Sequence, residues 1–340
     1  MAPPSLRIRE TPEDFVVEEI LKYHPSGEGD HTFLFIEKRM LTTEDVVKRI
    51  AAEAGVASRD VGYAGRKDRV AIARQWFSVP GLAPARAREF SIEGVQVLEA
   101  VPHRHKLRTG QLRGNRFEIR VRGADADAAQ RARKALESVE RSGMVNRFGS
   151  QRFGRSGDNA ARGLALLRGE GRPPSGRGKG RGGGRAARFL VSALQAEVFN
   201  EVLRTRPLAL DRVECGDVAV VVASGGLFVV EDEARENERV ACFEISPTGP
   251  IFGRKVTLPS GAPAVREAQV LAALGVPLLS ELKLPRGLSL RGARRPLRVR
   301  VDDVEMTQET DVLTFRFGLP AGSYATVFLD QLLGPLDGAG

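Results

Sequence analysis

The chain is poor in the residues that build metal and redox sites. It has two cysteines, Cys215 and Cys242, and four histidines among 340 residues. Two thiols without a histidine pair nearby make a poor zinc site, and so few cysteines are typical of a reduced chain. No run of about 18 apolar residues occurs, and the N-terminal stretch lacks the apolar core of a secretory signal. We therefore expect a cytoplasmic protein without a metal, a cofactor or a membrane segment.

Positive charge is what the chain has in excess. The formal net charge is +9, which favours a polyanionic partner such as nucleic acid but also fits a merely basic soluble protein. The excess is concentrated between Arg168 and Arg188, where seven cations face one acid, Glu170. The part 168–185 is rich in Gly, Arg and Pro and cannot bury apolar surface, so we expect a flexible loop. It would either hold RNA loosely or act as a spacer.

The apolar periodicity predicts an α+β chain with strands at both ends and helices in the middle. Alternation or buried runs indicate strands over 11–21, 30–38, 70–79, 115–123, 295–306 and 312–320. Helical spacing occurs over 42–55, 125–143, 186–204, 265–275 and 322–334. In the first of these helices, Thr42 or Thr43 can cap the start and Gly55 the end.

The stretch GYAGRKDRVAIARQWFSV, residues 62–79, places one acid among cations in a turn between two strands. Asp68 stands beside Arg66, Lys67 and Arg69. Nearby positive charge favours the ionised form of a carboxyl, as a nucleophile or general base requires. The alternative is an ion-paired surface turn, which the residues alone favour. The glycines lie three apart, so the segment is not a phosphate-binding P-loop.

The stretch VNRFGSQRFGRSGDN, residues 145–159, interleaves aromatic and cationic residues. Phe148 and Phe153 could stack on an unpaired base, and arginines and amides stand between them. The polar members are Arg147, Arg152, Arg155, Asn146, Gln151 and Asn159. The other interpretation, two core phenylalanines beside surface arginines, is the commoner case.

The stretch PHRHKLRTGQLRGNRF, residues 102–117, forms a basic stripe. Its cationic and titratable residues are His103, Arg104, His105, Lys106, Arg108, Arg113 and Arg116. A His-x-His pair without further ligands is a weak metal site. Contact with RNA phosphates and a solvated basic hairpin remain as alternatives.

Together these segments resemble the TruD family of tRNA pseudouridine synthases. The match is carried by TPEDFVVEE, GYAGRKDRVAIARQWFSV, HKLRTGQLRGNRFEI, NRFGSQRFG, SALQAEVFNEVL and FGLPAGSYATVFL. Their order is that of the family, and they span nearly the whole chain. The strings G-x-A-G-x-K-D-[KR] and N-x-F-G-x-Q-R-F-G are highly specific as a pair.

The resemblance implies an α+β pseudouridine-synthase fold, with a central antiparallel sheet flanked by helices and an inserted TruD-specific α/β domain. In this chain the catalytic domain would be discontinuous, formed by 1–155 and 293–340. The inserted domain would cover 156–292. The Gly/Arg segment 168–185 has no expected counterpart in the family, so no role is carried over to it.

The resemblance also implies roles for individual residues. Asp68 would be the catalytic carboxylate, and Phe148 the active-site aromatic that other pseudouridine synthases supply as Tyr. Asn146 would orient the base or Asp68, and Arg9 stands where the family commonly has Lys. Arg147 replaces the Tyr of the familiar N-Y-F-G string. We further expect substrate contacts from Lys67, Gln151 and Arg152, and RNA-backbone contacts from Arg104, Lys106, Arg108 and Arg113.

The implied reaction converts a uridine of tRNA, uridine 13 of the D arm in the bacterial members, to pseudouridine. Nothing is oxidised or reduced, so no cofactor or metal is required. We expect a monomer whose partner is tRNA. The alternative from another class is a tRNA-binding chaperone that folds the RNA without modifying it.

Overall fold

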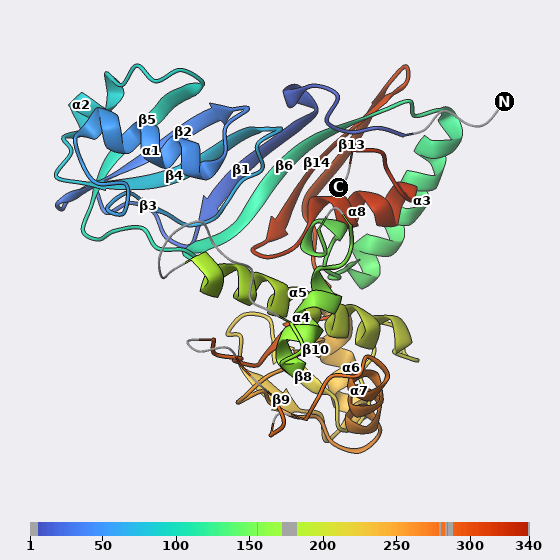
Figure 1. The fold of residues 1–340 in the computed structure, drawn as a ribbon. Helices are drawn as coiled ribbons and strands as arrows, with labels where there is room; N and C mark the ends of the chain where they lie inside the picture. The colour runs from blue at the N-terminus through green and yellow to red at the C-terminus, as the bar shows by residue number, and fades with distance from the viewer. Residues whose placement is uncertain are drawn as a thin grey trace. The chain divides into compact units, whose positions relative to one another are not determined.

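The computed structural model describes residues 6–154, 156–171, 182–278, 280–282, 284 and 288–338, with only the backbone of residues 182, 183 and 185. The described residues fall into two compact units (Figure 1). Unit 1 takes those in 6–135, 301–325 and 332–338, and unit 2 those in 136–300 and 326–331. Helices α3 (Ala126–Ser142) and α8 (Ala325–Leu333) cross the division in sequence.

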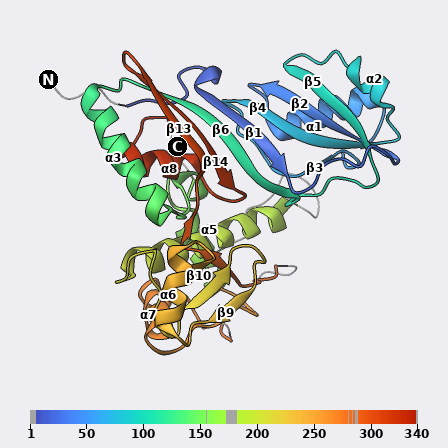
Figure 2. The same ribbon diagram turned by 180° about the vertical axis from the view of Figure 1, so that it is seen from behind.

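Unit 1 is built on an eight-stranded sheet. Its order is β13-β14-β6-β1-β4-β2-β5, with β3 paired to β4. Every pairing is antiparallel except that of β1 with β4, so the sheet is mixed at one position. The strands are β1 (Phe15–Leu21), β2 (His31–Arg39), β3 (Gly62–Tyr63), β4 (Ile72–Pro80), β5 (Val95–His103), β6 (Leu112–Arg122), β13 (Asp302–Glu309) and β14 (Val312–Pro320). Figure 2 shows the same sheet from behind.

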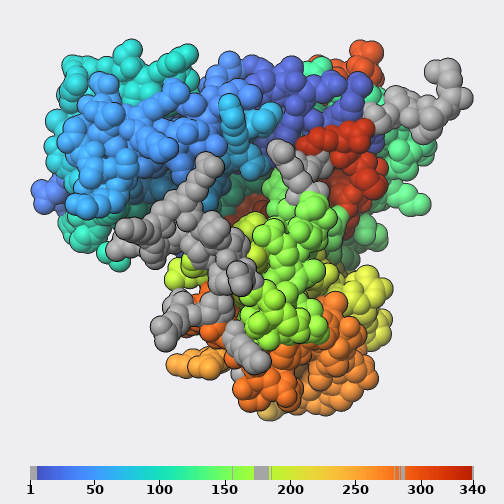
Figure 3. Space-filling view, viewed as in Figure 1, coloured from blue at the N-terminus to red at the C-terminus, as the bar shows by residue number. Residues whose placement is uncertain are grey.

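Helix α1 (Thr43–Ala54) covers one face of this sheet, as its periodicity predicts. Thr42 and Asp45 form a capping box at its start, and Gly55 ends it in the left-handed conformation at φ 70°. Its inner face packs on β2 and β4 in one buried cluster that includes Val46, Leu34 and Phe77. In Figure 3 the outer side of α1 is part of the solvent-facing surface drawn in blue. Short helices η1 (Pro12–Asp14) and α2 (Pro84–Arg88) complete this part of the chain.

Unit 2 combines helices with a four-stranded sheet of order β11-β10-β8-β9 and a two-stranded pairing of β12 with β7. Gly163 of α4 lies against the backbone of α5, where an added Cβ would stand 2.3 Å from the Leu190 oxygen. The helices are η2 (Ser150–Arg152), α4 (Asn159–Arg168), α5 (Gly182–Thr205), α6 (Glu233–Ala241) and α7 (Gly261–Ala273). The strands are β7 (Met144–Val145), β8 (Val218–Val221), β9 (Leu227–Val229), β10 (Ile245–Ile251), β11 (Ala293–Pro296) and β12 (Arg298–Val299).

The predicted α+β class is confirmed, and most strands and helices near both ends lie where the periodicity places them, although the strand expected over 11–21 begins only at Phe15, after η1. The helical middle is an incomplete description, because it also contains β8, β9 and β10. The single strand expected over 295–306 is three strands, β11, β12 and β13, and Asp303 has φ 50° where β13 bulges. Of the expected Gly/Arg loop, 172–181 lies outside the described residues and 182–185 is helical. The predicted domain boundaries stay a prediction.

Candidate active site

Asp68 lies in the turn between β3 and β4, and its carboxylate is reachable from solvent. The side chain is 52% exposed, and its Oδ2 accepts a hydrogen bond of 2.8 Å from the Arg9 guanidinium. The two residues are 59 positions apart in sequence. The Arg9 side chain is only 10% exposed, and its guanidinium lies 4.2 Å from the centre of the Phe15 ring. The half-exposed Asp68 carboxylate is therefore hydrogen-bonded to a guanidinium that packs on the Phe15 ring.

The backbone around Arg9 fixes this contact. Arg7 pairs with Arg122, and the Ile8 N–H donates to the Asp337 carbonyl. Arg9 itself has φ 63°, a left-handed conformation that costs a residue with a side chain about 1 kcal/mol or more. Burial lowers the pKa of Arg9 while the Asp68 charge raises it, and a guanidinium stays cationic after such a shift.

The three cations next to Asp68 in sequence have other partners, and among the described residues none of them forms an ion pair with its carboxylate. Neighbours along an extended turn project in different directions, and each finds its own partner. Arg66 pairs with Glu44 at 2.9 Å, Lys67 with Glu19 at 2.8 Å, and Arg69 donates to the Met40 carbonyl at 3.2 Å. The cation that faces Asp68 is Arg9, which the resemblance singles out and sequence distance hides.

Lys67 is part of a buried polar network beneath the turn. Its ammonium donates at 2.8 Å to both the Glu19 carboxylate and the Asn115 side-chain oxygen. The Lys67 side chain is 6% exposed and that of Glu19 is fully buried. In this structure the Lys67 ammonium is thus committed to the support of the turn. Its expected contact with substrate stays a prediction.

A second buried lysine holds the backbone of Asp68 itself. Lys38 on β2 is fully buried, and its ammonium donates to the carbonyls of Asp68 at 2.7 Å and Leu41 at 2.6 Å. Burial lowers the pKa of Lys38 from 10.5 to about 8, with Asp68 opposing the shift. Lys38 was not singled out from the sequence, because nothing in its local pattern marks a lysine that turns inward.

Two further side chains complete the support. The Thr43 hydroxyl, next to the cap of α1, accepts from the Lys67 N–H at 3.0 Å and donates to the Gln75 side chain at 3.0 Å. Gln75 in turn donates to the Gly65 carbonyl at 3.3 Å. Strands β1, β2, β4 and β6 and helix α1 therefore all contribute to one turn, which gives Asp68 a defined position.

In unit 2, Phe148 and Asn146 meet on one guanidinium. Arg295 stacks 4.2 Å from the centre of the Phe148 ring, and it donates to the Asn146 carbonyl at 3.0 Å and side-chain oxygen at 2.6 Å. The backbone of Phe148 exchanges two hydrogen bonds with the Asn200 side chain, at 2.8 and 3.0 Å. Both predicted residues are buried, Phe148 at 8% exposure and Asn146 at 3%. Arg295 was missed, because 147 positions separate it from Phe148.

The rest of this motif divides between surface and core. Arg152 lies 5.6 Å from the Phe148 ring centre, and its buried Nε has no hydrogen-bond partner among the described residues. Gln151 is half-buried in η2, and Phe153 packs against the core of α4 and α5. Arg147 pairs with Asp330. Arg155 lies outside the described residues. Asp68 belongs to unit 1 and this group to unit 2, so each is described within its own unit.

The basic stripe of 102–117 is largely on the surface. Arg104, Arg108 and Arg113 are exposed, and Arg104 forms an ion pair with Glu28. The Lys106 ammonium donates to the Arg59 carbonyl. His103 is a core residue instead. It stacks on Tyr23 at 5.4 Å, its Nδ1 accepts from the Ser26 N–H at 3.1 Å, and burial lowers its pKa.

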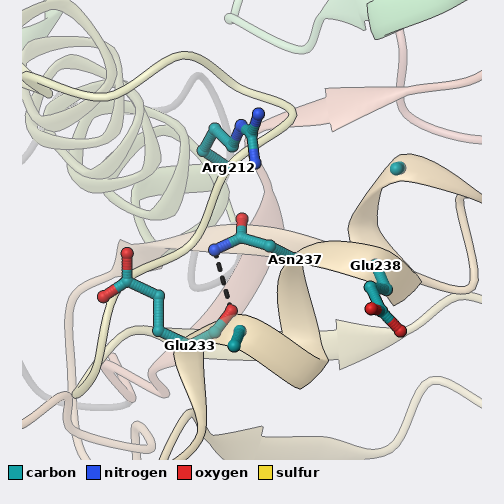
Figure 4. Close-up of a pocket in the computed structure, with 6 residues that line it drawn as sticks. Arg212, Glu233, Asn237 and Glu238 are labelled. Atoms are coloured by element: carbon teal, nitrogen blue, oxygen red, sulfur yellow. Dashed lines mark hydrogen bonds between the residues drawn. The ribbon is translucent and has the colours of Figure 1, made fainter.

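A shallow hollow elsewhere on unit 2 is lined by Arg212, Glu233, Asn237 and Glu238 (Figure 4). Asn237 donates to the Glu233 carbonyl at 2.8 Å and exchanges two hydrogen bonds with the Val213 backbone. Its amide is therefore structural. In the described part of the chain, no group of three or more His, Cys, Asp or Glu side chains is placed to hold a metal ion. Nor does any described helix have the length and apolar character needed to cross a membrane.

The chain matches a known protein family along most of its length. The model described as "tRNA pseudouridine synthase D (TruD)" matches residues 3–172 and 185–332. Curated relatives named tRNA pseudouridine synthase D include those of Anaeromyxobacter sp., 42% identical over 96% of this chain and 92% of the relative. Others are those of Thermus thermophilus, 41% identical over 96% and 88%, and of Geobacter sulfurreducens, 38% over 96% and 93%.

A solved structure has the same fold. It is the putative tRNA pseudouridine synthase D of Methanosarcina mazei, with a TM-score of 0.76, 20% identity, and coverage of 98% of this chain and 94% of that one. The mixed sheet and its helices thus define an α+β protein with the fold of that structure. The chain belongs to the TruD family of tRNA pseudouridine synthases.

Proposed function

We propose that this protein isomerises uridine 13 in the D arm of tRNA to pseudouridine, with Asp68 as the catalytic carboxylate. The observation that supports this most strongly is the turn at Asp68. The Asp68 side chain is 52% exposed. The buried Lys38 donates to the backbone carbonyl of Asp68, and Arg9 donates to its carboxylate. A surface turn without a function has no need of contacts from so many elements, whereas a catalytic group must be held in place.

The chemistry needs a carboxylate and no external reactant. The C1′–N1 bond breaks, the uracil turns, and C1′–C5 forms, while C5 loses a proton and N1 gains one. Asp68 either adds to the sugar carbon or removes a proton on a glycal-type path. Both roles require an anion, and the Arg9 guanidinium donates a hydrogen bond to the carboxylate and so orients it. The two paths remain alternatives.

The uridine has to leave the folded tRNA before it can react, at a cost of a few kcal/mol. We assign Phe148 to support the extruded uracil, a stacking contact worth about 1–3 kcal/mol. Asn146 and Arg295 would position that ring, because Arg295 stacks on Phe148 and donates a hydrogen bond to Asn146. Gln151 and Arg152 would contact the same nucleotide, and the cations Arg104, Lys106, Arg108 and Arg113 would contact the RNA backbone.

The test is to incubate the purified chain with an unmodified tRNA transcript and map pseudouridine at each position. We expect modification at uridine 13 that grows with time and needs no added metal or cofactor. Pseudouridine at another position would refute the site assignment. Binding of tRNA without any pseudouridine would instead favour the folding chaperone.

A further inference from the structure

Two chain segments far apart in sequence lie side by side in unit 2, one just after β10 and the other just before β11, and we call this close approach the crossing. The Arg254 N–H donates to the Leu290 carbonyl at 2.9 Å, and the Gly292 N–H donates to the Arg254 carbonyl at 2.8 Å. Arg254 and Arg291 thereby form a parallel bridge, although they are 37 positions apart in sequence. The crossing places two guanidinium-bearing residues next to each other.

The crossing is tight enough to require glycine on both segments. A Cβ added to Gly253 would stand 2.7 Å from the Gly292 nitrogen, and one added to Gly292 would stand 2.7 Å from the Gly253 oxygen. Gly253 also has φ 152°, at the edge of the region that L residues avoid. The two positions therefore hold the segments closer than other residues would allow.

Both segments are also anchored in the core. Phe252 is 4% exposed and Leu290 3% exposed, and they belong to the same buried cluster. The Gln195 side chain of α5 donates to the Phe252 carbonyl at 2.7 Å. Two buried neighbours and a buried hydrogen bond give the residues at the crossing a rigid base.

The side chains at the crossing carry unbalanced positive charge. Arg254, Lys255 and Arg291 are all exposed, and none has an ion pair within 4.0 Å among the described residues. Nearby Arg294, by contrast, pairs with Glu267 at 2.7 Å. Like charges held side by side repel each other, and an anion bound between them would relieve that repulsion.

We propose that Arg254, Lys255 and Arg291 form a phosphate-binding patch on unit 2 that contacts the backbone of the tRNA substrate. The proposal rests on the proposed function and adds a surface to it. Guanidinium and ammonium groups on one rigid base suit phosphate oxygens. A protein partner is less suited, because stable protein interfaces need an apolar centre, and this patch is formed by cations and glycines.

The patch is tested with the triple substitution Arg254→Gln, Lys255→Gln and Arg291→Gln, made in the Asp68→Asn chain. That background separates binding from turnover. Affinity for an unmodified tRNA transcript is measured at several salt concentrations. We expect roughly 5–30-fold weaker binding near physiological salt. The slope of log K against log[salt] should fall by about 2–3, or 0.7–0.9 for each lost phosphate contact.

A matched control changes the same amount of charge elsewhere on unit 2. Arg162, Arg204 and Arg235 pair with Asp158, Glu201 and Glu236. Their exchange for glutamine should leave the slope nearly unchanged. A second variant, Arg254→Lys with Arg291→Lys, should keep most of the tRNA affinity. This result would show that the loss in the glutamine variant comes from the missing charge and not from misfolding.

Two outcomes would overturn the patch. They are a salt slope that the three substitutions leave unchanged, and a loss of tRNA affinity in the control as large as that in the patch variant. Failure of the proposed function is distinct from these. A wild-type chain that binds tRNA with the expected slope but makes no pseudouridine would refute the function and retain the patch.

Discussion

The buried pair of Glu19 and Lys67 gives a quantitative test of how the Asp68 turn is supported. The Glu19 side chain is fully buried, and the Lys67 ammonium has only Glu19 and Asn115 as partners in the described structure. Glu19→Leu leaves the ammonium buried without its anion. Removal of one partner of a buried ion pair costs about 3–5 kcal/mol, so we expect a loss of that size in the free energy of unfolding.

Two further variants separate charge from packing. In Glu19→Gln the amide oxygen can still accept from Lys67, so the loss should be smaller, about 1–3 kcal/mol. In the double variant Glu19→Leu with Lys67→Met no charge is left unpaired, and replacement by apolar residues is often nearly neutral. The double-mutant cycle should therefore show a coupling of about 2–4 kcal/mol.

The chain carries its own probe for this measurement. Trp76 is the only tryptophan, it lies on β4 of unit 1, and its backbone N–H donates to the Glu19 carboxylate at 3.4 Å. Urea unfolding followed by its fluorescence reports the sheet that holds the turn. A double variant as unstable as Glu19→Leu alone would refute the reasoning, because the loss would then reflect packing and not an unpaired charge.

Two other predictions concern unit 1 and unit 2 separately. Because burial lowers the pKa of Lys38 to about 8, the folded chain releases this proton before the unfolded chain does. The stability of the wild type relative to Lys38→Met should be flat below pH 8 and rise toward pH 10.5; a flat difference throughout would contradict this. Gly292→Ala should lower the unfolding free energy by about 1–3 kcal/mol through its contact with the Gly253 oxygen. Gly226→Ala, whose Cβ would meet only the Ser224 side chain, is the control, and equal melting temperatures for the two variants would contradict the crowding argument.

Elements with a clear local signal were predicted well. The spacing and caps of 42–55 give α1, and the alternation of 115–123 gives most of β6, because each pattern is complete within one segment. Strand β10 was not foreseen. Its sequence ISPTGPI contains Pro247 and Pro250, which usually mark turns, yet all but the last of its residues are buried. Here burial between two neighbouring strands overrides local preference.

The candidate site was predictable in its centre and not in its surroundings. Asp68 was singled out because the motif of the resemblance names it, although the residues alone favoured an ion-paired surface turn, and its catalytic role stays a prediction. The direction of its neighbours is a tertiary property. Lys38, Thr43 and Gln75 reach the turn from β2, α1 and β4, and no spacing in the sequence links them to it. The same holds for Arg295, which reaches Asn146 across 149 positions.

The central claim is that the carboxylate of Asp68 carries out the isomerisation. The most direct measurement compares wild type and Asp68→Asn on the same tRNA transcript, with pseudouridine mapped by position and tRNA affinity measured in parallel. Asparagine keeps the size of the side chain and removes its charge. The account predicts unchanged affinity within a few-fold and no detectable pseudouridine at uridine 13. Conversion by Asp68→Asn at a rate near that of the wild type would contradict it.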